Sequence, residues 1–170
     1  LRVDHVMSLF RLWWVPRGFN SSDGVYVHYP LEALMQRLVH ISDEARCLVI
    51  GEDLGTVPDE VRHAMDTYRL FQYKVLLFEK IGSRFKSPGE YAQRSVATVT
   101  THDLPPLKAW WQSDDIELRE ALGLYPTAET ANHLRRERDT DRRELLMALT
   151  AADLWHWQAH ESIPEYSLSL

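Results

Sequence analysis

The sequence predicts an α/β fold in which short strands alternate with helices. Apolar or β-branched segments, each ended by an acidic residue, are separated by segments whose apolar residues recur every three or four positions. The clearest strand candidate, residues 47–50, is apolar throughout, as is typical of a parallel strand covered on both faces. Helical connections are what a parallel sheet requires.

Residues 1–5 are expected to form the first strand. Side chains alternate along a strand, so Arg2 and Asp4 would lie on one side and Val3 on the other. An arginine beside an aspartate keeps the carboxylate ionised, as a nucleophile requires. A purely structural ion pair is the alternative.

Adjacent Trp13 and Trp14 follow, and residues 17–30 after them are rich in Gly, Ser, Asn and Asp. This composition predicts a surface loop over residues 17–30, longer than most such connections and therefore a candidate for function. Paired tryptophans usually belong to a core, and we expect core packing for at least one of them. Flat aromatic rings beside acids also stack on sugars.

Two helices are expected on either side of the apolar strand at residues 47–50. The apolar residues of Leu31–Ala45 recur at helical spacing, with charged residues on the opposite face. A second helix is predicted over residues 58–68, because Pro58 suits a first helical turn, where its missing N–H has no partner to lose.

The strand at residues 47–50 is followed by Gly51, which allows close backbone approach, and then by Glu52 and Asp53. A strand that ends in carboxylates and leads into a helix has its chemistry at the carboxyl end. The alternative is that both acids are loop residues bound by backbone amides and the helix N-terminus.

Two more strands are predicted further along the chain. Residues 73–78 end in Glu79, and the β-branched residues 95–101 end in His102 and Asp103. With Asp4 and Glu52, every predicted strand therefore ends in an acid.

The remaining segments are expected to be loops and helices. A loop is predicted over residues 80–94, and helices are predicted over residues 116–122 and 127–155. Charges of alternating sign in residues 135–144 indicate a solvated helix face, not a binding patch. Residues 162–170 are expected to be irregular.

Sequential parallel strands with helical crossovers favour either a closed eight-unit barrel or a doubly wound sheet. No Gly-rich phosphate-binding fingerprint follows a strand, which argues against a nucleotide-binding sheet. Four units cannot close a barrel. The sequence therefore predicts a partial (β/α)8 TIM barrel of about four βα units plus C-terminal helices.

Composition excludes several classes of function. The net charge of −6 argues against a nucleic-acid partner, and no apolar run is long enough to cross a membrane. The single cysteine excludes an internal disulfide and favours a cytoplasmic location. We expect no metal and no cofactor, because cysteine-based zinc sites are impossible and the eight histidines do not cluster. The sequence begins with Leu1 and not with Met, so we expect it to be part of a longer chain.

Carboxylates that converge at one rim of a barrel suit retaining glycoside chemistry. One ionised carboxylate attacks the anomeric carbon, and a second donates a proton to the leaving oxygen and later accepts one. Neighbouring parallel strands can supply the separation of about 5–5.5 Å that this pair needs. A third acid beside a histidine can hold sugar hydroxyls.

Four motifs carry a resemblance to a known family: LRVDHVMSLFRLWWVP, GVYVHYP, VIGEDLGTVP and VATVTTHDLPPL. In this order and spacing they resemble the 4-α-glucanotransferase family (amylomaltase, disproportionating enzyme), whose fold is an α-amylase-like (β/α)8 barrel. The resemblance covers essentially the whole chain. It implies that residues 1–170 are a fragment of the catalytic barrel, with strands like the fourth to seventh and without the earlier strands and the last one.

The resemblance also implies roles for individual residues. Asp4 would be the nucleophile, Glu52 the general acid/base and Asp103 the transition-state stabiliser. Arg2 and His102 would hold the carboxylate and the sugar. Trp14, with Trp13 and the loop at residues 17–30, is a candidate for substrate binding. The implied substrates are maltodextrins, with glucose or maltose as acceptors.

Three alternatives remain open. One is an α-amylase-like hydrolase with the same chemistry. A second is a metal-dependent barrel enzyme that uses Asp4, His5, Glu52, Asp53, His102 and Asp103, although strand alternation puts His5 opposite Asp4. The third is a non-catalytic folding or interaction module. We also expect a fragment with open sheet edges to lack transferase activity alone and to self-associate.

Overall fold

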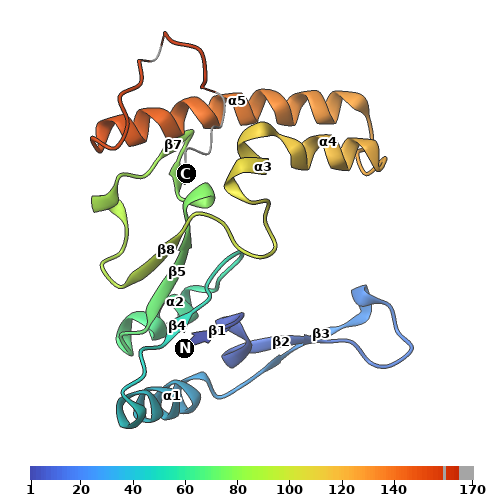
Figure 1. The fold of residues 1–170 in the computed structure, drawn as a ribbon. Helices are drawn as coiled ribbons and strands as arrows, with labels where there is room; N and C mark the ends of the chain where they lie inside the picture. Colours follow the sequence, from blue (N-terminus) through green and yellow to red (C-terminus); the bar gives the residue numbers. More distant parts are fainter. Residues whose placement is uncertain (159, 165–170) are drawn as a thin grey trace. The chain divides into compact units, whose positions relative to one another are not determined.

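The computed structural model describes residues 1–158 and 160–164 and divides into two compact units. The first unit comprises Leu1–Lys74 and Ala92–Ala97. The second comprises Val75–Tyr91 and the described part of Thr98–Leu170. Both units are drawn in Figure 1.

A four-stranded sheet contains all the strands that the sequence predicted. Its order is β1-β4-β5-β8, and both β1 with β4 and β4 with β5 pair in parallel. The bounds are Arg2–Val3 for β1, Ile50–Gly51 for β4, Phe71–Val75 for β5 and Ser95–Thr98 for β8. The predicted α/β class with a parallel sheet is therefore confirmed, and the described residues form no closed barrel.

These strands are shorter than expected, and β1 and β5 each end where the chain turns into a 3-10 helix. β1 stops before His5, which takes a left-handed conformation (φ 45°) and starts the 3-10 helix Val6–Leu9. β5 gives way to the 3-10 helix Leu76–Phe78. β8 ends at Thr98, three residues before the predicted end.

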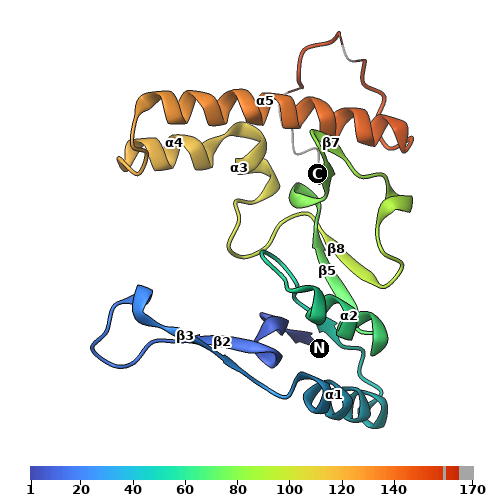
Figure 2. The same ribbon diagram turned by 180° about the vertical axis from the view of Figure 1, so that it is seen from behind.

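The prediction of a loop over all of residues 17–30 is wrong, because residues 25–28 form a strand of an antiparallel hairpin. Strands β2 (Arg11–Trp14) and β3 (Val25–His28) pair with Trp13 opposite Tyr26. The hairpin projects from the end of β1 in both views (Figures 1 and 2). Trp13 and Trp14 are 45% and 56% exposed, so the expectation that at least one packs in the core is wrong.

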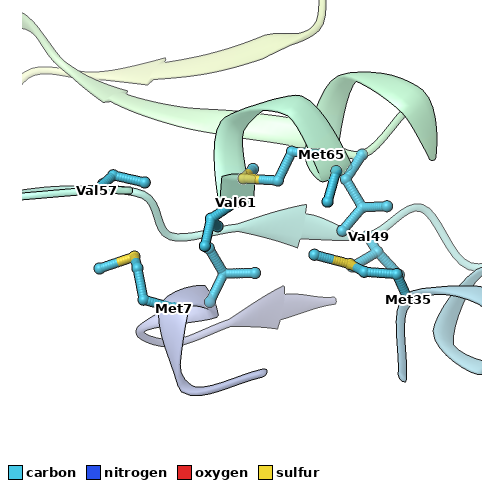
Figure 3. Close-up of a cluster of buried hydrophobic side chains, with 9 residues drawn as sticks. Met7, Met35, Val49, Val57, Val61 and Met65 are labelled. Atoms are coloured by element: carbon cyan, nitrogen blue, oxygen red, sulfur yellow. The ribbon is translucent and has the colours of Figure 1, made fainter. Parts of the chain in front are cut away.

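Helices α1 (Leu31–Ala45) and α2 (Asp59–Thr67) are those the sequence predicted, with Pro58 at the N-cap of α2 instead of inside its first turn. Their apolar faces meet the start of the chain in one buried cluster (Figure 3). The cluster consists of Val6, Met7, Met35, Val49, Val57, Val61, Ala64, Met65 and Leu70. Gly51 lets this cluster pack closely, because an added Cβ would lie 2.9 Å from Met65 Cε and 3.0 Å from Val6 Cγ2 and would displace them.

The second unit is mostly helical. Its elements are the antiparallel pair β6 (Lys80–Ile81) and β7 (Arg84–Phe85), then α3 (Leu107–Gln112), α4 (Asp114–Ala121) and α5 (Ala128–Ala151). The pair β6–β7 lies inside the predicted loop over residues 80–94, and α5 ends four residues before the predicted end. Residues 162–164 are irregular as expected, and 165–170 lie outside the described residues.

Residues 135–144 of α5 have the predicted solvated face, but their other face is half-buried and contacts α3 and α4. Arg138 forms a two-pronged ion pair with Asp115 (2.9 and 3.0 Å) and lies over the Trp110 ring at 4.8 Å. Arg142 donates to Ser113 Oγ at 2.7 Å, and burial lowers the pKa of its guanidinium. The alternating charges therefore link helices within this unit.

Among the described residues, no helix combines the length and the hydropathy needed to cross a membrane.

Candidate functional site

Asp4 lies immediately beyond the carboxyl end of β1, where its exposed side chain is held by one arginine. Arg2 NH1 is 2.6 Å from Asp4 Oδ1, and 73% of the Asp4 side chain is exposed. The guanidinium also lies over the ring of Tyr73 on β5, with 5.2 Å between Cζ and the ring centroid. The expected contact between Arg2 and Asp4 is present.

Glu52 lies beyond the carboxyl end of the neighbouring strand β4 and is almost buried, with 8% of its surface exposed. Its Oε2 accepts the backbone N–H of His5 at 2.8 Å, and its Oε1 accepts that of Leu54 at 2.7 Å. The backbone of Glu52 also bonds to the segment around Asp4: its N–H donates to Val3 O (2.9 Å), and its C=O accepts from Val6 N–H (3.0 Å).

These bonds bring the turn after Asp4 against the Glu52 carboxylate. The left-handed backbone of His5 directs its N–H to that carboxylate, so one structural feature explains both the short strand and the contact. Two N–H donors fix the orientation of the side chain. The contacts are also those expected if Glu52 were a loop acid bound by backbone amides.

Asp53 differs from Glu52 in that its carboxylate is held by side-chain cations as well as by a backbone N–H. Its side chain is fully buried, accepts the N–H of Tyr73 at 3.0 Å and pairs with Lys74 Nζ at 3.1 Å. Arg62 NH1 on α2 lies 3.8 Å away. Asp53 therefore ties the segment after β4 to β5 and to α2.

Glu79 also forms an ion pair: Lys86 Nζ lies 2.5 Å from Glu79 Oε2. Of the acids that end the predicted strands, Glu79 is thus an ion-pair residue within the second unit.

A polar residue in an apolar strand, Lys74 in FQYKVLLF, was the available sequence signal for the buried partner of Asp53.

His102 and Asp103 lie in the second unit. Their side chains are 72% and 80% exposed, and His102 Nε2 is 3.2 Å from Asp103 Oδ2. The N–H of Asp103 donates to Thr101 Oγ1 at 3.2 Å. The expected gathering of Asp103 with Asp4 and Glu52 stays a prediction.

The hairpin tryptophans are oriented by hydrogen bonds at their ring nitrogens. Trp14 Nε1 donates to Tyr29 Oη at 3.1 Å, and Trp13 Nε1 donates to Ser21 O at 2.9 Å. Trp13 also meets Tyr26 edge to face, with 4.9 Å between ring centroids. Both rings are held by the protein and retain exposed surface.

No cluster of three or more metal-ligating His, Cys, Asp or Glu side chains occurs among residues 1–158 and 160–164. Asp53, which the metal-dependent alternative required, is engaged by Lys74.

Comparison with known proteins agrees with the motifs. A family model described as 4-alpha-glucanotransferase matches residues 1–166. The 4-alpha-glucanotransferase of Haemophilus influenzae is 44% identical over 149 residues, which are 88% of this chain and 21% of that protein. That of Mycobacterium tuberculosis is 37% identical over 131 residues, 73% of this chain and 18% of the relative.

Solved structures agree as well. Amylomaltase from Corynebacterium glutamicum superimposes with a TM-score of 0.81 at 34% identity, covering 89% of this chain and 22% of that one. Amylomaltase from Streptococcus agalactiae in complex with acarbose, 18% identical with a TM-score of 0.53, shares the fold. The chain spans about a fifth of the length of the curated relatives it matches. With a family model that covers nearly all of its residues, this chain belongs to the 4-alpha-glucanotransferase family.

Proposed function

We propose that residues 1–170 are part of the catalytic (β/α)8 barrel of a cytoplasmic 4-α-glucanotransferase and supply strands like the fourth to seventh. The observation that carries the proposal is the pair of acids beyond β1 and β4. These strands are adjacent and parallel, Asp4 is held by Arg2, and Glu52 accepts the N–H of the residue that follows Asp4.

In the proposed reaction, ionised Asp4 attacks the anomeric carbon of an α-1,4-glucan. The bond to the leaving oxygen breaks as Glu52 donates a proton to it, which leaves a glycosyl ester on Asp4. The 4-hydroxyl of an acceptor sugar then gives its proton to Glu52 and attacks the same carbon, releasing Asp4. Two inversions give net retention.

Arg2 supports the first step, because its guanidinium, 2.6 Å from Asp4 Oδ1, orients the attacking carboxylate. Asp103, with His102, would stabilise the positive charge that develops on the sugar ring. Trp14 and Trp13 would hold the acceptor, and an acceptor that excludes water favours transfer over hydrolysis. Glucose or maltose would serve as acceptor.

Trapping the glycosyl ester tests this assignment in the full-length polypeptide that contains residues 1–170. After incubation with a slow-reacting glycosyl donor, the peptide that carries the sugar should contain Asp4. Asp4→Asn should form no ester, whereas Glu44→Gln, which changes an exposed acid on α1, should form it normally. An ester on any other residue would refute the role of Asp4.

The products decide between transfer and the hydrolase alternative. Maltotriose should give a ladder that includes longer maltodextrins. Shorter products alone would indicate an α-amylase-like hydrolase.

A further inference from the structure

Tyr73 on β5 connects the two candidate carboxylates through contacts that the proposed mechanism does not use. Its backbone N–H donates to Asp53, the residue after Glu52, and its ring lies under Arg2, the partner of Asp4. We propose that Tyr73 is a positioning residue, held by Asp53, that orients Asp4 through Arg2. The inference rests on the proposed function.

The backbone of Tyr73 is firmly held. The Asp53 carboxylate that accepts its N–H is fully buried and is neutralised by Lys74, whose side chain is 13% exposed. A buried carboxylate keeps its partners, since leaving it unpaired in an apolar interior is costly. The backbone that carries the Tyr73 ring is therefore held by the segment that also carries Glu52.

The orientation of the Arg2 guanidinium, in turn, depends on the Tyr73 ring. The Arg2 side chain is 34% exposed, so without a neighbour the guanidinium could adopt many orientations. Two contacts restrict the planar cation: the Asp4 carboxylate at 2.6 Å from NH1 and the ring centroid at 5.2 Å from Cζ.

Asp4 needs this support more than Glu52 does. The Asp4 side chain is 73% exposed, and within the described part of the chain its ion-pair partner is Arg2. An attacking carboxylate must lie close to the anomeric carbon in a narrow range of orientations, and small displacements are costly in rate. Losing the ring should therefore slow the chemical step more than it weakens substrate binding.

The test compares Tyr73→Leu, which removes the ring face and keeps the backbone N–H, with Tyr73→Phe, which keeps the ring. In the full-length polypeptide, kcat for maltotriose disproportionation should fall about fivefold in Tyr73→Leu, the equivalent of about 1 kcal/mol for a cation–π contact. KM should stay within about twofold, and Tyr73→Phe should retain most of the wild-type kcat.

Phe85→Leu is the matched control. It removes an aromatic ring that lies 5.0 Å from Lys80 Nζ in the second unit and leaves Arg2 untouched. It should lower the melting temperature and leave kcat unchanged. The inference is overturned if Tyr73→Leu keeps the wild-type kcat, if Tyr73→Phe loses as much as Tyr73→Leu, or if only KM rises.

A measurement without turnover separates this inference from the proposed function. In NMR spectra of the full-length polypeptide with labelled arginine and aspartate, the ring current of Tyr73 should shift the Arg2 side-chain signals, and the Asp4 side chain should gain motion in Tyr73→Leu but not in Tyr73→Phe. If the wild-type polypeptide forms no maltodextrin longer than maltotriose, the proposed function fails. Unchanged Asp4 motion in Tyr73→Leu would refute the positioning role, whatever the activity.

Discussion

Gly24 is the residue on which the placement of Trp13 depends. A Cβ at this position would lie 2.4 Å from Trp13 Cε2, so alanine cannot be accommodated unless the indole moves. Movement would break the bond from Trp13 Nε1 to Ser21 O and the contact with Tyr26.

Gly24→Ala should therefore change the tryptophan fluorescence and lower the free energy of unfolding by about 1–3 kcal/mol, the usual cost of overpacking. Gly89→Ala is the control, because no atom lies within 4 Å of its added Cβ. Identical fluorescence and stability in the Gly24 variant would contradict this packing.

Glu90 is an exposed acid with an unusually strong set of partners. Arg84 binds both of its oxygens at 2.8 Å, and the N–H and hydroxyl of Ser87 bind Oε2 at 2.7 and 2.9 Å. The Arg84 guanidinium, followed by Ser87, holds the pKa of Glu90 well below its usual value of 4.5.

A carboxyl whose pKa is lowered by folding stabilises the folded state above its unfolded pKa and loses this contribution as the pH falls toward the folded value. Glu90→Gln should therefore melt below the wild type near neutral pH, and the gap should shrink once the pH falls below about 4.5. Added salt should reduce the gap as well, since the pair is exposed. A gap that does not change with pH would contradict the lowered pKa.

At the scale of elements, the end of α2 carries a strained residue that glycine would relieve. Arg69 takes a left-handed conformation (φ 59°), with its N–H bonded to Asp66 O at 3.2 Å and that of Leu70 to Met65 O at 2.9 Å. This is the Schellman arrangement, in which glycine is the preferred residue.

Arg69→Gly should raise the free energy of unfolding by up to about 1 kcal/mol, because the penalty for a Cβ in this region disappears. Arg37→Gly, an exposed position inside α1, should lower it by about 1 kcal/mol. Thermal unfolding of both variants measures the difference. A loss of stability in Arg69→Gly would show that its side chain contributes more than its backbone costs.

At the scale of the whole molecule, the sheet has two outer strands, β1 and β8. Unpaired backbone groups along an outer strand invite pairing with another chain, and a charged side chain on such a strand opposes it.

We expect the 170-residue chain to self-associate as its concentration rises. We also expect that this chain, on its own, does not convert maltotriose to longer maltodextrins. Ala97→Lys, a change at an exposed position of β8, should reduce association in sedimentation velocity experiments. A monodisperse wild-type monomer at all concentrations would contradict the open edge, and formation of longer maltodextrins would contradict the expected inactivity.

The sequence by itself determined the α/β class, helix α1, most of α2 and the family. These features are local: helical periodicity, an apolar strand before Glu52 and motifs in a set order can all be recognised without knowing which segments meet.

Only the tertiary structure decided what the polar and aromatic residues contact. Glu52 and Asp53 are neighbours of identical charge, yet one accepts the N–H of His5 and the other pairs with Lys74. Trp13 and Trp14 are exposed on the hairpin of β2 and β3, and Arg138 is half-buried because Asp115 and Trp110 cover it. Such contacts join residues far apart in the chain, so their outcome depends on packing that no local pattern encodes.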